Sequence, residues 1–265
     1  MSAATLSGRH IVVTRPAGQA DSLCEAIEAR GGNALRYPVL AIGEPADKRA
    51  IDGIATRLAG FDLAFFVSPN AVSHALDPIL AQRTWPAGLR VATVGKGSER
   101  ALAAYGFKDV IAPQSGFDSE AVLALPEFQA DVVAGRRVVI FRGDGGRDLL
   151  GETLRERGAA VEYVTCYRRY CPVIDPAPLL ALAAAGRLDA ITLTSSEGVG
   201  NLRVMVGDAG WPVLRKVAVF APHPRIVAHA RAAGFELVLE TPPGDDGLIG
   251  ALESHFRHAS VTLRS

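Results

Sequence analysis

The segment GRHIVVTRPAGQADSL, residues 8–23, is matched by GRRVVIFRGDGGRDLL, residues 135–150, at a shift of 127 positions. The same shift brings FDLAFFVSPNAV at 61–72 onto LDAITLTSSEGV at 188–199. A third pair, AAYGF and RAAGF, follows after one residue of slippage. Three stretches that agree on nearly one offset indicate a tandem duplication, and a repeat of this length determines how the whole chain is read.

Each copy alternates short apolar runs with amphipathic stretches. Helices are expected at 20–30, closed by Gly31 and Gly32, and at 149–157, closed by Gly158. Buried strands are expected at 10–14, 63–67, 91–95, 109–112, 137–141, 161–165, 190–194, 216–221 and 236–239. This alternation predicts an α/β fold: two flavodoxin-like lobes, each a five-stranded parallel sheet with helices on both faces.

Composition excludes several classes of function. Lys plus Arg and Asp plus Glu are equal, at 28 each, so a nucleic-acid partner is not expected. The longest apolar run, Leu179 to Ala185, is too short to cross a bilayer, and no secretory signal opens the chain. Three cysteines without a CxxC pair favour neither a disulfide framework nor zinc. We expect a cytoplasmic protein that handles a small molecule, without a membrane partner.

Ligands of open parallel sheets bind beyond the carboxyl ends of the strands. There the chain places loops rich in Gly, Ser and Pro, several with a cation, at 14–16, 68–70, 95–98, 142–147, 195–198 and 221–224. Backbone N–H groups and arginines in such loops suit an anion. The alternatives are structural: Ser68 and Ser195 are good helix N-caps, Arg15 and Arg142 can serve in surface ion pairs, and His223 can be a solvated loop side chain.

Familiar catalytic motifs are absent. GDGGRD lacks the third glycine of a dinucleotide fingerprint, because Asp148 occupies that position. The sequence contains no phosphate loop, HExxH or GxSxG, and its histidines lack metal-ligand spacing. Cys166 is expected to be a small buried hydrophobe on a strand. The residues alone therefore predict a two-lobed α/β protein for a polyanionic small molecule, with no cofactor and no metal.

The order of these pieces resembles one family. IVVTRP from Ile11, FVSPNAV from Phe66, VATVGKGSERAL from Val91 and VVIFRGDGGRDLL from Val138 come first, followed by LRERGAAVEYVTCYRR, DAITLTSSEGV and AAGFE. Together they resemble uroporphyrinogen-III synthases over nearly the full chain. The resemblance implies that linear hydroxymethylbilane is closed to uroporphyrinogen III, with inversion of the last pyrrole ring and loss of water. The product feeds tetrapyrrole biosynthesis of the heme, siroheme or chlorophyll type.

The resemblance also implies roles for single residues. Tyr167, in VTCYRR, stands at the family's recurring tyrosine and is the candidate acid that helps the hydroxyl leave; a packed connector tyrosine is the alternative. The substrate carries eight carboxylates, so cations and hydroxyls near the cleft would bind it. The resemblance implies substrate binding by Arg15, Ser68, Arg147, Ser195 and Lys216. The loops at the strand ends add the candidates Thr14, Lys96, Arg142, Ser196, His223 and Arg225.

One loop departs from the family pattern. The chain reads Ala221-Pro222-His223-Pro224-Arg225 where relatives show a glycine followed by threonines. Pro224 brings neither an N–H nor a hydroxyl, so either His223 or Arg225 would take over binding there. The departure keeps an alternative open, a non-enzymatic two-lobed protein that binds or senses a tetrapyrrole or another polycarboxylate.

The resemblance further implies interleaved lobes. The first lobe would join 1–37 with 172–265, the second would be 43–166, and 38–42 and 167–171 would form an antiparallel two-stranded link. Hydroxymethylbilane is the partner expected. The protein is expected to act as a monomer, with room for transient contact with the preceding enzyme of the pathway.

Overall fold

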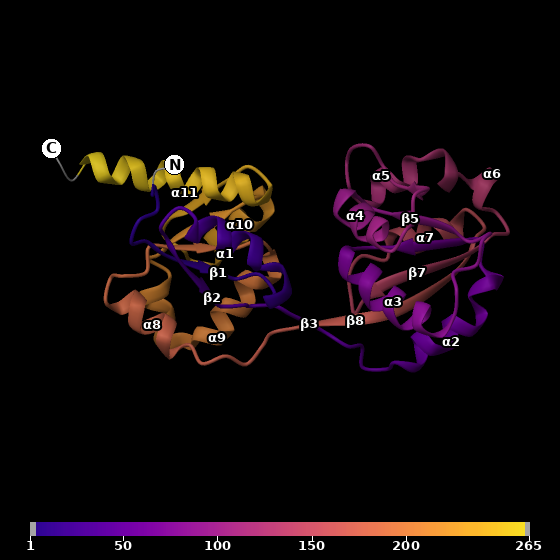
Figure 1. Cartoon of the computed structure of the whole chain (residues 1–265), viewed down its shortest axis with the longest axis horizontal. Coiled ribbons are helices and arrows are strands. Elements are labelled where there is room, and N and C mark those ends of the chain that lie inside the picture. Colours follow the sequence, from indigo (N-terminus) through magenta and orange to yellow (C-terminus); the bar gives the residue numbers. More distant parts are fainter. Residues whose placement is uncertain (1–3, 263–265) are drawn as a thin grey trace. The chain divides into compact units, whose positions relative to one another are not determined.

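The described part of the chain, residues 4–262 of the computed structural model, alternates strands and helices throughout (Figure 1). It divides into two units, of which the first is built from two separate segments and the second from one continuous segment. The first unit ends at Ala41 and resumes at Tyr170, and the second is Ile42–Arg169.

The sheet of the first unit has five strands in the order β2-β1-β9-β10-β11, and all of its paired strands are parallel. Ile11 on β1 lies opposite Ala190 on β9, although 179 positions separate them in the chain. The strands are β1 (His10–Val13), β2 (Asn33–Arg36), β9 (Ala190–Thr192), β10 (Ala218–Ala221) and β11 (Val238–Glu240). The order is that of a flavodoxin-like sheet.

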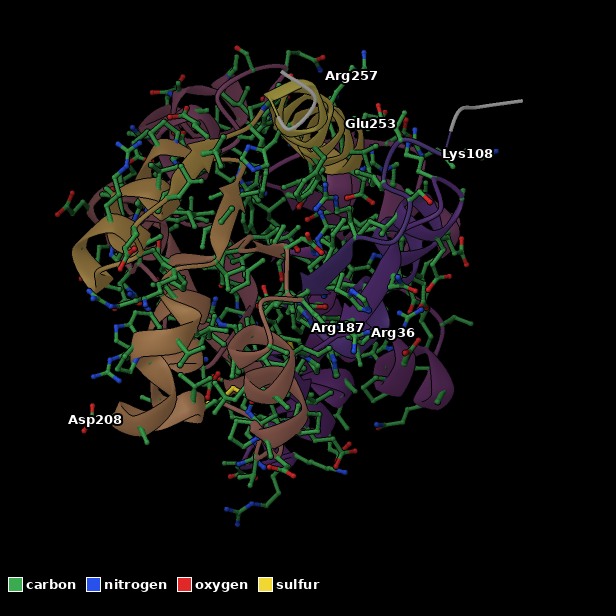
Figure 2. The ribbon with its side chains drawn as sticks, turned by 90° about the vertical axis from the view of Figure 1, so that its left-hand side faces the viewer. Arg36, Lys108, Arg187, Asp208, Glu253 and Arg257 are labelled. Atoms are coloured by element: carbon green, nitrogen blue, oxygen red, sulfur yellow. The ribbon has the colours of Figure 1, made fainter. Side chains whose placement is uncertain are left out.

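Five helices cover the two faces of this sheet. They are α1 (Asp21–Glu28), α8 (Ala177–Ala184), α9 (Ser196–Leu214), α10 (Pro224–Ala233) and α11 (Gly244–Thr262). Leu23 of α1 and Leu248 of α11 share one apolar cluster with β1, whereas α8, α9 and α10 pack on the other face. On α11, drawn in yellow in Figure 1, Glu253 accepts hydrogen bonds from Thr5 and Arg30, both at 2.7 Å, and is labelled in Figure 2. These contacts fasten α11 beside α1.

The sheet of the second unit has six strands in the order β3-β8-β7-β4-β5-β6. Pairs from β8 to β6 are parallel. The strands are β3 (Ala41–Gly43), β4 (Leu63–Phe66), β5 (Arg90–Thr93), β6 (Val110–Ile111), β7 (Arg137–Gly143) and β8 (Ala160–Tyr170). When strands related by the sequence repeat are matched, β8-β7-β4-β5-β6 has the same order as β2-β1-β9-β10-β11.

Helices again cover both faces of the second sheet. One face carries α2 (Arg49–Arg57), α3 (Pro69–Gln82) and α4 (Lys96–Ala104); the other carries α5 (Ser119–Ala124), α6 (Ala130–Val133) and α7 (Leu149–Glu156). Phe66 and Phe141, on adjacent strands, stack with ring centroids 4.9 Å apart. Such aromatic pairs fix the register of β4 against β7.

The structure corrects the sequence prediction in two places. β2 was not among the predicted strands, because Asn33–Arg36 has only two apolar residues and forms a sheet edge. The predicted connecting strand 167–171 is not separate: β8 runs unbroken from Ala160 to Tyr170. The partner strand predicted at 38–42 is limited to β3, which borders β8 within the six-stranded sheet.

Neither a membrane-spanning helix nor a clustered metal site is found in the part of the chain that the structure describes. No helix among residues 4–262 combines the length and apolar character needed to span a membrane. In the same part of the chain, no group of three or more His, Cys, Asp or Glu side chains is arranged to hold a metal ion.

Candidate functional site

A cavity of about 360 Å³ opens beyond the carboxyl ends of β4, β7 and β8 in the second unit. It brings together four of the predicted residues, namely Ser68, Arg142, Arg147 and Tyr167. They are separated by as many as 99 positions in the chain and meet because parallel strands end at one edge of the sheet. This edge is where the sequence predicted ligand binding.

A bulge in β8 aims Tyr167 into this cavity. Opposite β7, Arg142 pairs with Thr165 and the next residue, Gly143, pairs with Tyr167, so Cys166 is an extra residue in the ladder. Strict alternation would place Tyr167 and Cys166 on opposite faces of the sheet. The bulge places both in the apolar cluster that faces α3.

The ring of Tyr167 is held on several sides. Its hydroxyl lies 3.1 Å from Ser68 Oγ. A Cβ at Gly143 would come within 2.7 Å of the ring, so only glycine allows the ring to lie here. The His74 ring of α3 is 5.7 Å away, centroid to centroid. The tyrosine is 5% exposed and is one of the residues that line the cavity.

Ser68 has two partners. It is the N-cap of α3, and its Oγ accepts the N–H of Ala71 at 3.1 Å, so the predicted capping role is confirmed. Because Oγ accepts this bond, the Ser68 hydroxyl hydrogen is not used in capping. The neighbouring group on that side is the Tyr167 hydroxyl. A helix cap that also contacts the tyrosine fixes the hydroxyl relative to the sheet.

Two arginines that line the cavity are paired with carboxylates or loop carbonyls. Arg142, 12% exposed, pairs with Asp148 and donates to the Gly145 carbonyl at 2.6 Å. Arg147 pairs with Glu120 at 2.6 Å, and this hydrogen bond holds the pKa of the Glu120 carboxyl below its ordinary value. The ion pair given as the structural alternative for Arg142 is thus present.

Lys96 lies apart from the cavity. It is the first residue of α4, and its Nζ pairs with Glu99 at 2.9 Å on the same helix. Exposed pairs of this kind are worth little and exchange readily with a solution anion. Lys96 is therefore at the predicted edge of the sheet, although it does not line the cavity.

In the first unit, the predicted residues follow the carboxyl ends of β1, β9 and β10. Ser195 caps α9 by accepting the Gly198 N–H at 2.9 Å, and Ser196 is the first residue of that helix. His223 Nδ1 accepts the N–H of Arg225 at 3.1 Å and so caps α10. Pro224 stands at the first position of the helix, where no N–H is needed, so the divergent loop still presents a helix N-terminus.

Thr14 and Arg15 are engaged within the first unit. The Thr14 hydroxyl is buried and donates to the Thr192 carbonyl at 2.5 Å, so it ties β1 to β9 rather than facing a ligand. Arg15 pairs with Asp245 at 2.6 Å. Burial raises the pKa of Asp245, but hydrogen bonds from Arg15 and Ser22 outweigh it and leave that pKa below its ordinary value.

Replacing Asp245 by Asn should lower the free energy of unfolding by about 0.5–1 kcal/mol at pH 7. A depressed carboxyl pKa stabilises the fold above its ordinary value of 3.8, and that stabilisation is lost as the pH falls through the folded value. The difference between wild type and Asp245→Asn should therefore shrink below about pH 4. Urea unfolding between pH 7 and pH 3 measures this difference in unfolding free energy. The control is Asp21→Asn, which removes the more exposed ion pair with Arg36. A difference independent of pH would contradict the assignment.

Lys216 is at the wrong edge of its sheet. It precedes β10 and borders a depression with Asp189, which precedes β9, so it lies at the amino ends of the parallel strands. Ser195 and His223 follow the carboxyl ends of the same two strands. Family likeness suggested Lys216 as a substrate ligand, and the strand direction excludes it from the edge that holds the others.

Sequence reasoning missed residues that shape the cavity. Gly143 falls within a predicted loop, but its role depends on where the Tyr167 ring lies, which no local pattern shows. Phe117 and Tyr163 also line the cavity; Phe117 lies in none of the quoted motifs, and Tyr163 lies in LRERGAAVEYVTCYRR without having been singled out. Cys166 is buried on β8 as predicted, and burial raises the pKa of its thiol to about 12, so it is not a nucleophile at neutral pH.

Two flavodoxin-like sheets in one chain, with polar side chains beyond their carboxyl ends, are the features of a two-lobed α/β enzyme that acts on a small molecule. A family model described as uroporphyrinogen-III synthase HemD matches residues 21–250. The chain belongs to the uroporphyrinogen-III synthase family, the cyclising hydro-lyases of tetrapyrrole biosynthesis. The resemblance seen in the sequence is thereby confirmed.

Individual relatives agree with this assignment. The uroporphyrinogen-III synthase of Salmonella typhimurium is 37% identical over 72% of this chain and 78% of its own, and that of Escherichia coli is 30% identical over 92% and 99%. A mutant uroporphyrinogen III synthase from Thermus thermophilus superposes with a TM-score of 0.59 at 18% identity, covering 96% of this chain and 99% of its own. The enzyme from Helicobacter pylori gives 0.58 at 12% identity, covering 93% and 99%. These structures share the fold.

Proposed function

We propose that this chain closes hydroxymethylbilane to uroporphyrinogen III and that Tyr167 supplies the proton for the first step. The observation that supports the proposal most strongly is the Tyr167 hydroxyl. It is presented to a cavity by a strand bulge and set 3.1 Å from Ser68 Oγ, in a chain of the uroporphyrinogen-III synthase family.

The first chemical step is the loss of the terminal hydroxyl group. Its C–O bond breaks, the oxygen leaves as water after accepting one proton, and the pyrrole nitrogen lone pair stabilises the cation that remains as an azafulvene. A hydroxyl leaves poorly without a proton, so one positioned donor is the main chemical demand on the protein. Tyr167 meets this demand, and Ser68 orients it.

The second step decides which isomer forms. The azafulvene carbon must meet the substituted carbon of the last ring, giving a spiro-pyrrolenine whose rearrangement inverts that ring. Closure at the unsubstituted carbon gives the isomer without inversion and needs no catalyst. Positioning of the chain is therefore the selective act, and the fixed geometry around Tyr167 supports it.

Carboxylates of the bilane would bind the cations of the cavity, and the helix N-termini of the first unit are further candidates for carboxylate binding. Arg142 and Arg147 border the cavity, and Ser195, His223 and Arg225 lie at helix starts in the first unit. Net charge is zero, so binding depends on these local donors rather than on the field of the whole protein. Exchange of a protein carboxylate, such as Glu120, for a substrate carboxylate would release Arg147 to the ligand.

The test is to supply freshly generated hydroxymethylbilane and separate the product isomers by chromatography. We expect isomer III to form faster than the spontaneous reaction, with isomer I suppressed. Isomer I alone, at the spontaneous rate, would overturn the proposal and leave a non-enzymatic tetrapyrrole-binding protein. Heat-unfolded protein at the same concentration gives the spontaneous baseline.

We further propose that the protein acts as a cytoplasmic monomer that needs no cofactor. The cytoplasmic location is supported by the cysteines. Among the described residues, Cys24, Cys166 and Cys171 are free thiols, and the first two are buried. Free thiols suit a reducing compartment. Transient contact with the enzyme that supplies the bilane belongs to the same proposal, and sedimentation with and without that enzyme tests both.

A further inference from the structure

We propose that the cavity around Tyr167 receives a single pyrrole ring of the bilane and that Phe117 is the aromatic face on which this ring stacks. The inference rests on the proposed function, because it names the part of the substrate that this site holds. It is carried by an exposed, strained phenylalanine at the lining of the cavity.

The backbone of Phe117 is in an unusual conformation. Its φ is +38°, and within residues 4–262 it is the only non-glycine residue with a positive φ. Such a conformation costs an L-residue free energy that glycine would not lose. Both neighbours are constrained: a Cβ at Gly116, whose φ is +91°, would come within 2.7 Å of Ala121, and Asp118 caps α5 by accepting the Ala121 N–H at 2.8 Å. The loop holds Phe117 in place at a cost to stability.

The side chain does not recover this cost by burial. Phe117 is 51% exposed, whereas a phenylalanine that served packing would be covered. Part of its ring lies on Gly95, where a Cβ would come within 3.1 Å, and the ring borders the cavity. Gly95, the N-cap of α4, thus lies beneath one part of the ring. The rest of the Phe117 ring surface is exposed.

The chemistry of the lining fits a pyrrole with acid side chains. Phe117 offers aromatic surface, while Arg147 and Arg142, whose guanidinium lies over the Tyr163 ring at 4.8 Å, offer cations at the same cavity. A flat electron-rich ring stacks on aromatic faces, and its acetate and propionate groups suit guanidinium donors. A volume of about 360 Å³ is at the lower end of ligand pockets, which span about 300–1,000 Å³. It suits one substituted ring, not four.

The alternative role for Phe117 is purely structural, and the two roles differ in their effect on stability. If the ring serves packing, both Phe117→Ala and Phe117→Gly should lower Tm. If it serves the substrate, Phe117→Gly relieves the strained φ and keeps Tm at or above the wild-type value, while substrate binding weakens. Phe117→Ala retains the strain but loses the ring, so it separates the two effects.

The experiment measures kcat, KM and Tm for four variants of the full chain. We expect Phe117→Gly and Phe117→Ala to raise KM for hydroxymethylbilane about tenfold with kcat changed less than about threefold. Phe117→Tyr, which keeps the aromatic face, should restore KM. Leu80→Ala, at an exposed apolar residue of α3, is the matched control and should leave KM and kcat unchanged.

Three results would overturn the inference: an unchanged KM in Phe117→Gly, failure of Phe117→Tyr to restore KM, or a fall in Tm in both small variants without a change in KM. Failure of the proposed function is distinguishable, because wild type would then form no isomer III. In that case the dissociation constant for uroporphyrinogen III is measured in the same variants. An equal affinity in wild type and Phe117→Gly would then reject the stacking role.

Discussion

Replacement of Tyr167 by Phe should lower kcat about 100-fold while the dissociation constant for uroporphyrinogen III changes less than about threefold. The ring and its packing remain, and only the hydroxyl that bonds Ser68 is lost. A general acid contributes about 10²–10⁴-fold to a rate, and its removal affects the transition state more than the bound product. Single-turnover formation of isomer III measures the rate, and product titration measures the affinity.

Tyr105→Phe is the matched control for this substitution. Its hydroxyl donates to Asp77 at 2.6 Å in the same unit, and it does not line the cavity. Burial and the neighbouring Asp77 raise the pKa of Tyr105 to about 12, so it stays protonated under any assay condition. Loss of this hydroxyl should leave kcat unchanged. Equal losses of rate and affinity in Tyr167→Phe would make Tyr167 a positioning residue instead of the acid.

The second large effect is expected for Gly143→Ala. A Cβ there would come within 2.7 Å of the Tyr167 ring, a distance that real Cβ atoms do not tolerate, so the ring must move. A displacement of about 1 Å at a reacting group can cost about 100-fold in rate. We expect kcat to fall at least tenfold, with a lower Tm from the strain in β7 and β8.

Gly53→Ala provides the control for this substitution. Gly53 lies within α2, nothing surrounds its Cβ position within 4 Å, and alanine there should raise stability by about 0.5–1 kcal/mol without an effect on kcat. The double variant Gly143→Ala with Tyr167→Phe distinguishes the mechanism. If glycine acts through the tyrosine, the two rate losses do not add. Fully additive losses would show that Gly143 acts independently of the hydroxyl.

Much of the fold could be predicted because its strands are short, apolar and buried. Leu63–Phe66 is fully apolar and buried on both faces, and residues of this kind have no other place in a soluble domain. The helix predicted at 149–157 is found as α7, because an apolar stripe and a closing glycine are local signals. The strand Asn33–Arg36 lacks such a signal and becomes a strand only because β1 is beside it.

The candidate site could be predicted in part. Ser68, Arg142, Arg147 and Tyr167 follow strands that the pattern identifies, and parallel strands bring their ends together. The bulge at Cys166 could not be predicted, because it depends on pairing with β7. Lys216 shows the opposite case: likeness to a family placed it near the ligand, whereas the direction of β10 places it at the far edge.

The division of strands between the two units sets an order for folding during synthesis. Every strand of the second unit is synthesised before β9, the central partner of β1. Until then β1 and β2 are a two-stranded fragment, which is marginally stable alone. Pairing of β1 with β9 requires Ala190, which follows its partner Ile11 by 179 positions in the chain. β1 and β2 therefore precede the whole second unit in the sequence, yet they belong to the unit that is completed after it.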